Sequence, residues 1–234
     1  MIVYGFALSA TIVIASLATS NQSTVSSCSS LGNQYETARS AVVPIATDKG
    51  IGTAFAVQNQ HTLLTAYHVI EEANEIYANW ASGRVNISVK DAAPEYDLAL
   101  LTIEKPVDNF MVLSSHYETT DMLYALGWPG NAFNAGQASV SGGIVSRTLS
   151  NSDLKLNSPE TPPGLEIVQT DAAVNPGNSG GPVINYCGVI GVAQSISDSS
   201  ATHEYIGVVS EQGISYAISS KTAAQRFNLP ITSD

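Results

Sequence analysis

The chain has 234 residues, of which 44% are hydrophobic and 12% are charged, and its formal net charge is −11. This length and apolar content allow one large core or two small ones. The excess of acidic side chains opposes binding to nucleic-acid phosphates, and the sequence has no basic stripe with interleaved aromatic residues. We therefore expect no nucleic-acid partner.

Residues 1–35 differ from the rest of the chain. The run from Ile2 to Leu17 is almost wholly apolar, a polar stretch follows it, and Glu36 is the first charged residue. Such a run is typical of a cleaved export signal, with small residues suited to cleavage after Ala18, or of a retained membrane anchor. A buried strand or helix is the third alternative. We expect an exported protein (secreted, periplasmic or cell-surface), attached to the membrane if the segment is retained, with its folded domain over residues 36–234.

From Thr37 onward the sequence consists mainly of short β-type runs between Gly-rich turns. Many short strands at regular spacing are typical of β-barrels or a sandwich. The expected strands are 41–45, 52–57, 61–65, 85–89, 98–103, 122–126, 166–169, 181–184, 189–193, 206–209 and 214–218. The Pro-rich stretch 149–164 is expected to be a loop. Helical turns are expected at 69–75 and at 221–227, where Ser219 and Ser220 are candidate caps.

The segment Asn-Pro-Gly-Asn-Ser-Gly-Gly-Pro at residues 175–182 contains a candidate nucleophile, Ser179. A nucleophilic serine needs a tight turn that exposes its hydroxyl beside backbone N–H groups, and flanking glycines permit such a turn. A plain surface turn has the same composition, so this segment alone does not decide between the two interpretations.

Two further segments supply partners for a nucleophilic serine. His68 follows the apolar run Leu-Leu-Thr-Ala-Tyr, which would hold a general base rigidly. Asp97 stands at the start of the apolar run Leu-Ala-Leu-Leu, where a buried carboxylate needs a donor such as a histidine N–H. Each residue also has an ordinary structural explanation, but the order His, Asp, Ser joins the three into one candidate site.

These three segments resemble those of the chymotrypsin-fold (trypsin-like) serine proteases, most closely the HtrA/Deg branch. The stretches that carry the resemblance are 125–130, 143–146, 169–182 and 213–218. The resemblance implies an all-β fold of two six-stranded antiparallel β-barrels with a short C-terminal helix, and a catalytic triad in the cleft between the barrels. It also implies protein or peptide substrates.

The resemblance further assigns roles around the triad. Gly177 and Ser179 would donate the N–H groups of the oxyanion hole, with Asn178 between them. The segment of Gly191, Val192 and Ala193, continuing to Gln194, would pair with the substrate backbone. Ala173 would form the floor of the specificity pocket, with Ser215 and Tyr216 in its walls. Because Ala173 offers no carboxylate, we expect a preference for small or medium aliphatic residues before the scissile bond.

Two departures from the family pattern limit what is carried over. The sequence ends where HtrA-type proteases usually continue into a PDZ domain, so PDZ-dependent regulation is not implied. Asn178 stands where the digestive relatives have an aspartate that pairs with a new N-terminus, so trypsinogen-type activation is not expected. Asp171 is expected to give structural support.

The remaining polar residues suggest no cofactor. No His/Cys cluster has zinc-ligand spacing, so we expect no metal site and no metal requirement. Cys28 and Cys187 either form one disulfide or remain free thiols. His61, His116 and His203 are expected to be surface residues without a chemical role.

Two other functions fit parts of the pattern. A pseudoprotease would keep the scaffold as a binding module, but all three triad residues and the turn glycines are present. An esterase would use the same acyl-enzyme chemistry, and Gly177–Gly181 does read Gly-x-Ser-x-Gly. An α/β-hydrolase, however, would have the order Ser, Asp, His within a βαβ pattern, and neither occurs here.

Overall fold

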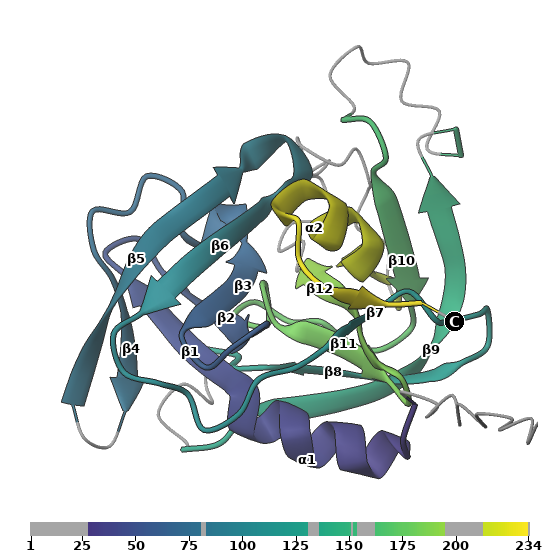
Figure 1. The fold of residues 1–234 in the computed structure, drawn as a ribbon, viewed down its shortest axis with the longest axis horizontal. Coiled ribbons are helices and arrows are strands. Elements are labelled where there is room, and N and C mark those ends of the chain that lie inside the picture. The colour runs from purple at the N-terminus through teal and green to yellow at the C-terminus, as the bar shows by residue number, and fades with distance from the viewer. Residues whose placement is uncertain are drawn as a thin grey trace, which may run out of the picture.

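A computed structural model describes residues 28–80, 83–130, 136–150, 152–153, 162–194 and 213–233. The strands form two barrels that lie side by side, one built from β1–β6 and the other mainly from β8–β13 (Figure 1). The helices α1 and α2 pack on the outside of this pair (Figure 1). The expected all-β double-barrel fold is confirmed.

The first barrel is closed by six antiparallel strands in the order β1-β2-β3-β6-β5-β4. Pairing of Ile45 in β1 with Ala78 in β4 closes the circle. Aliphatic side chains such as Val43, Leu63 and Leu101 fill its interior and are fully buried. The strands are β1 (Val42–Thr47), β2 (Ile51–Ala56), β3 (Thr62–Ala66), β4 (Ile76–Trp80), β5 (Gly83–Ala93) and β6 (Leu98–Ile103).

The second barrel follows the order β11-β8-β9-β10-β13-β12, and an additional pairing between β11 and β12 closes it. The short strands β7 (Leu113–Ser114) and β14 (Ile231–Thr232) extend this sheet by parallel pairing beyond β12. The barrel strands are β8 (Met122–Gly127), β9 (Ser139–Ser150), β10 (Glu166–Thr170), β11 (Pro182–Asn185), β12 (Gly188–Gln194) and β13 (Ser215–Ser219).

The helices confirm one sequence prediction and correct two others. α2 (Ser220–Phe227) begins at the expected cap, where the Ser219 hydroxyl accepts from the Thr222 amide. The helix expected over 69–75 is wrong: the chain makes a 3₁₀ turn at Tyr67–Val69, and Glu72 takes a left-handed conformation (φ 53°) that ends helical geometry. α1 (Leu31–Ala41) was not expected, and it spans the boundary predicted at residue 36.

Three other sequence predictions lie wholly or mostly outside the described residues. This holds for the apolar run from Ile2 to Leu17, the strand expected at 206–209 and most of the loop expected at 149–164, of which β9 already includes residues 149–150. The strands β4, β7, β9 and β14 were not predicted as strands. Within the described ranges, no helix has the length and apolar character needed to cross a membrane.

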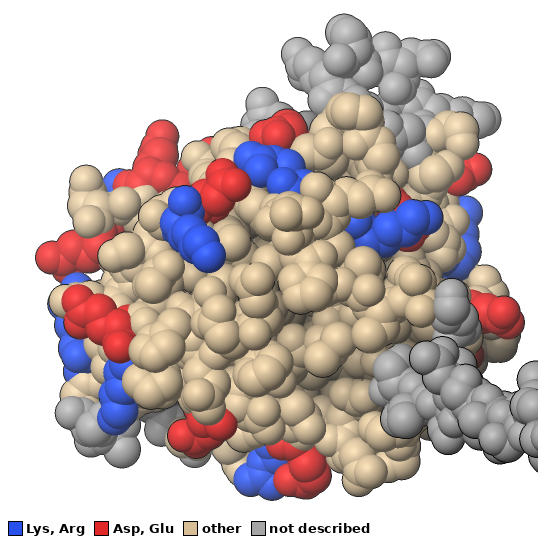
Figure 2. All heavy atoms as spheres, viewed as in Figure 1, with Lys and Arg blue, Asp and Glu red and all other residues tan. Residues whose placement is uncertain are grey.

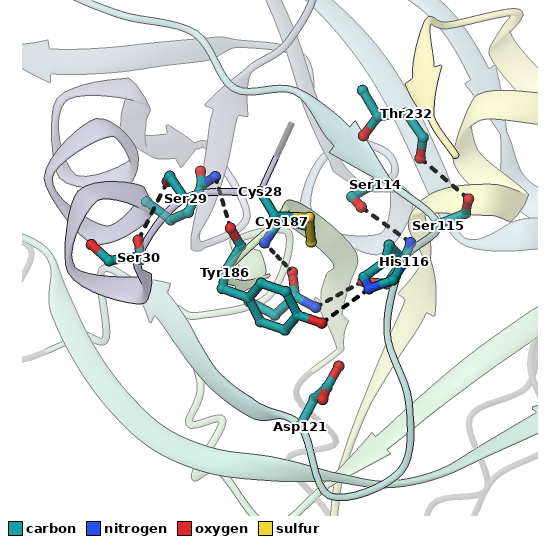
Figure 3. The surroundings of a disulfide bond; sticks show 12 residues. Cys28, Ser29, Ser30, Ser114, Ser115, His116, Asp121, Tyr186, Cys187 and Thr232 are labelled. Carbon is teal, nitrogen blue, oxygen red and sulfur yellow. Dashed lines mark hydrogen bonds between the residues drawn. A yellow bond between two sulfur atoms is a disulfide. The ribbon is translucent and has the colours of Figure 1, made fainter. Parts of the chain in front are cut away.

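A disulfide joins Cys28, just before α1, to Cys187 in the turn between β11 and β12 (Figure 3). This settles the alternative left open by the sequence in favour of the bonded pair. The bond ties the start of the described chain to the second barrel. Charged side chains are scattered over the face seen in Figure 2, which is mostly uncharged.

Candidate active site

The side chains of His68 and Asp97 meet because two neighbouring strands place them there. β3 and β6 run antiparallel, with Ala66 paired to Leu98. His68 lies in the 3₁₀ turn that follows β3, and Asp97 directly precedes β6. Asp97 has a left-handed backbone (φ 50°), which aspartate tolerates better than most residues, and this bend turns the chain into β6.

The Asp97 carboxylate binds both the backbone and the ring of His68. Its Oδ2 lies 2.7 Å from His68 Nδ1, and its Oδ1 accepts a 2.8 Å hydrogen bond from the His68 amide. The Asp97 side chain is fully buried, whereas that of His68 is 26% exposed. Two donors offset the cost of burying the carboxylate. With a proton on Nδ1, the His68 ring presents Nε2 as its proton acceptor.

Ser179 lies in a tight turn between two glycines with positive φ, Gly177 (φ 97°) and Gly180 (φ 82°). No side chain fits at either glycine: a Cβ on Gly177 would lie 2.6 Å from the Trp128 carbonyl oxygen, and one on Gly180 would lie 2.8 Å from the Ala66 amide nitrogen. The Gly180 contact sets the serine turn against the end of β3, two residues before His68. The structure therefore brings the turn of Ser179 to the strand that leads into His68.

Thr53 in β2 connects this turn to the first barrel. Its hydroxyl donates to the Gly177 carbonyl at 2.7 Å and accepts from the Trp128 amide at 2.9 Å, while its own amide donates to the Ser179 carbonyl at 2.9 Å. Thr53 is fully buried. Sequence reasoning missed this residue because an ordinary strand threonine carries no local signal of a partner 124 positions away.

The backbone N–H groups in the turn of Ser179 differ in whether they donate a hydrogen bond within the protein. The Asn178 amide donates to the Asn175 carbonyl at 2.9 Å, so it is used within the turn. Among the described residues, no hydrogen-bond partner is found for the Gly177 amide. The buried Asn178 Oδ1 likewise has no partner within the described part of the chain.

Comparison with known proteins decides the family. The model described as "Trypsin-like peptidase domain" matches residues 52–192, more than half of the chain. The chain belongs to this family. The match includes all three residues of the candidate site.

The chain is similar to HtrA- and DegP-type proteins. It is 34% identical over 162 residues to the "Probable periplasmic serine endoprotease DegP-like" of Chlamydia trachomatis, covering 67% of this chain and 30% of that protein. It is 35% identical over 153 residues to the "Putative serine protease HhoA" of Synechocystis, covering 63% and 37%. The chain thus spans about a third of the length of these curated relatives.

A solved structure, "HtrA-type protease AlgW with tripeptide", superposes on the trypsin-like peptidase with a TM-score of 0.68 and 32% identity. The alignment covers 85% of this chain and 62% of that one.

The predicted pocket residues are only partly brought together. Ala173 is exposed, and its carbonyl accepts from the Ser141 hydroxyl at 2.6 Å. Ala173 and Asn178 line a cavity of about 460 Å³. Ser215 accepts from the Val174 amide at 3.2 Å, and Tyr216 is buried in β13.

The prediction that Gly191, Val192 and Ala193 pair with a substrate strand is corrected by the sheet. β12 is paired on one side with β11 and on the other with β13, and these three residues are buried. The Ala193 amide donates to the Gly181 carbonyl, and its own carbonyl accepts from the Gly180 amide. Neither edge of β12 is therefore open at these positions.

The remaining polar residues have structural partners. Asp171 accepts from the Ile144 amide at 2.8 Å and so supports β9. His61 Nδ1 lies 2.9 Å from the Ile103 carbonyl oxygen. His116 is half-buried beside Tyr186 rather than on the surface, and His203 lies outside the described residues.

Proposed function

We propose that this chain is a serine endopeptidase that hydrolyses peptide bonds through an acyl-enzyme. The observation that carries the proposal is the fully buried Asp97 carboxylate, which binds the ring and backbone of His68 beside the glycine-flanked turn of Ser179. A histidine oriented in this way is suited to act as a general base. Membership of the trypsin-like peptidase family supports the same assignment.

In the proposed reaction, Ser179 Oγ attacks the scissile carbonyl and His68 Nε2 takes its proton. The Gly177 and Ser179 amides stabilise the oxyanion, which is the role of such donors in acyl transfer. His68 then returns the proton to the leaving amine as the C–N bond breaks. Water, deprotonated by His68, attacks the acyl-enzyme and releases the second product and Ser179.

We also propose a preference for small or medium aliphatic residues before the scissile bond. Ala173 supports this, because a lysine or arginine side chain would need a carboxylate there. The nearest acidic residue in sequence, Asp171, is engaged with the Ile144 amide. A peptide library read by mass spectrometry tests the preference, and dominant cleavage after lysine, arginine or acidic residues would contradict it.

The proposal also includes the substrates and the location of the protein: it acts on proteins or peptides and is exported. A tripeptide is named with the similar HtrA-type structure, and the word periplasmic is part of the name of the Chlamydia relative. Together with the apolar run from Ile2 to Leu17, these support an exported protease, with membrane attachment if that run is retained. Tracking the N-terminus of the mature chain by mass spectrometry distinguishes cleavage from retention.

The decisive experiment is active-site titration with a serine-directed fluorophosphonate, alongside casein hydrolysis. We expect one equivalent of label on the parent and none on Ser179→Ala, with casein turnover lowered on the order of 10⁶-fold. Ser88→Ala, which removes an exposed hydroxyl on β5 of the first barrel, serves as the matched control and should be labelled like the parent. An unlabelled parent would favour a pseudoprotease. Hydrolysis of a reporter ester without casein cleavage would favour an esterase.

A further inference from the structure

Figure 3 shows a second group of reactive side chains, around the Cys28–Cys187 disulfide. It lies just after β11, whereas Ser179 lies just before that strand. Cys28, His116 and Cys187 each offer one ligand atom, and these atoms lie within 4.8 Å of one another. They come from the segment before α1, the loop after β7 and the turn between β11 and β12. We propose that reduction of the Cys28–Cys187 disulfide turns this cluster into a binding site for a borderline-soft divalent cation of the Zn²⁺ type.

Cys28 is held near Cys187 by contacts that do not involve sulfur. The amide of Ser29, its neighbour, donates to the Tyr186 carbonyl at 2.7 Å, and the Gln34 side chain donates to the same oxygen at 3.4 Å. α1 itself packs against β11 and β8, with Ala38 and Ala41 fully buried. Reducing the disulfide therefore leaves the two thiols beside each other.

The buried side-chain amide of Asn185 bonds the backbone of both His116 and Cys187 and so fixes their relative position. Asn185 is fully buried; its Nδ2 donates to the His116 carbonyl at 2.8 Å, and its Oδ1 accepts from the Cys187 amide at 2.8 Å. The His116 ring is oriented by the Tyr186 hydroxyl, 3.0 Å from Nε2 (Figure 3). Such supporting hydrogen bonds are what orient the histidine ligands of metal sites.

The chemistry of this ligand set selects the ion. Two thiolates and one imidazole suit zinc, with Zn–S near 2.3 Å and Zn–N near 2.0 Å, so that ligand atoms on one tetrahedral ion are about 3.3–3.8 Å apart. In the oxidised chain the two sulfurs are bonded to each other, so after reduction they must separate to reach these distances, while the His116 ligand atom already lies within 4.8 Å of both. Water occupies the fourth position. Two thiolates also balance the charge of a divalent ion, so the partly buried site gains no net charge.

The disulfide and the metal are alternatives at the same atoms. Reduction by a phosphine consumes one water and yields two thiols and a phosphine oxide. Metal binding then displaces one proton from each thiol, so two protons are released per ion. The oxidised chain offers only His116 and cannot hold the ion.

The test is titration of the full chain with Co²⁺, with and without phosphine, under anaerobic conditions. We expect the reduced chain to develop a thiolate-to-cobalt absorption that saturates at one equivalent and is displaced by Zn²⁺. The oxidised chain should show none. His116→Ala should weaken binding by at least about tenfold, whereas the matched control His61→Ala should bind like the parent. Cys28→Ser should lose the absorption.

Three results would overturn the proposal: a reduced chain without the absorption, equal binding by His116→Ala and the parent, or loss of β-type circular dichroism on reduction. The last result counts because the hydrogen bonds around Tyr186 and Asn185 must hold the thiols in place once the disulfide is open. The proposal concerns metal binding and makes no claim on peptide hydrolysis, so it stands or falls separately from the proposed function.

Discussion

The two barrels hold their parts of the candidate site in different ways. In the first barrel, His68 and Asp97 are joined by the pairing of β3 with β6, and the two hydrogen bonds from His68 to the Asp97 carboxylate lie within that barrel. In the second barrel, the turn of Ser179 depends on a residue from the other side, because Thr53 in β2 bonds both Gly177 and Ser179. The base is thus positioned by one barrel, and the nucleophile by the interface of both.

The second barrel also carries more external support. α1, α2 and the strand β7 contact it, β14 pairs with β7, and the Cys28–Cys187 disulfide ties its β11–β12 turn to the chain before α1. The first barrel closes by pairing of β1 with β4; α1 packs against its β2, and Arg226 of α2 donates to its Ala92 carbonyl at 2.9 Å, but among the described residues no disulfide joins it to another segment. This difference predicts that loss of the His68–Asp97 hydrogen bonds in the first barrel lowers the rate of catalysis. Loss of the Cys28–Cys187 disulfide at the second barrel should instead lower the free energy of unfolding.

Asp97→Asn tests the first barrel and should have the largest effect of the three changes that compare the barrels. An amide at this position favours the wrong tautomer of His68, which lowers kcat by about 10⁴-fold in the well-studied serine protease case. The measurement is kcat on a peptide substrate, with circular dichroism to show that the fold is retained. Asp91→Asn, an exposed aspartate on β5 of the same barrel, is the control and should keep kcat within about twofold of the parent. A similar kcat for Asp97→Asn and the parent would remove His68 and Asp97 from the mechanism.

Removing the Cys28–Cys187 disulfide tests the second barrel. The bond closes a sequence separation of 159 residues, and loss of such a cross-link costs about 2–5 kcal/mol of unfolding free energy. We expect this loss in denaturant unfolding of a Cys28→Ser/Cys187→Ser chain, measured with chelator present. Hydrogen exchange should increase first in α1 and the β11–β12 turn. Exchange that increases first in β1–β6 would contradict the contrast between the barrels.

Thr53→Val tests the connection between the barrels and should have the smallest effect. The change leaves the Gly177 carbonyl and the Trp128 amide buried without their partner, which costs about 1–3 kcal/mol. Because these groups shape the serine turn, we expect a fall in kcat of about tenfold to a hundredfold, with little change in KM.

Two matched variants sharpen this prediction. Thr53→Ser keeps the hydroxyl and should recover most of the activity. Thr62→Val removes a hydroxyl from a buried position of the same barrel, at the end of β3 opposite to Ala66, and it should leave kcat unchanged. Equal losses in Thr53→Val and Thr62→Val would mean that Thr53 acts through general stability only.

Much of the fold was predictable because its signals are local. β2, β3 and β6 are short apolar runs with turn residues at their ends, and α2 begins at a serine that caps its first turn. α1 escaped prediction because its composition is polar and its apolar stripe is narrow: Leu31 and Tyr35 are only half-buried against the core, and the fully buried residues Ala38 and Ala41 are small. The expected helix after His68 failed because Glu72 adopts a left-handed conformation that residue propensities do not reveal.

The sequence by itself determined the order of His68, Asp97 and Ser179, since each stands in a local pattern of strand end or glycine turn that needs no partner to be read. Only the tertiary structure decided that Thr53 holds the serine turn, that both edges of β12 are occupied, and that Cys28, His116 and Cys187 meet. These contacts join positions far apart in the chain, and their geometry follows from how the two barrels close and pack. A hydrogen bond or a ligand cluster formed in this way does not depend on a repeating pattern in the sequence, so local sequence patterns cannot predict it.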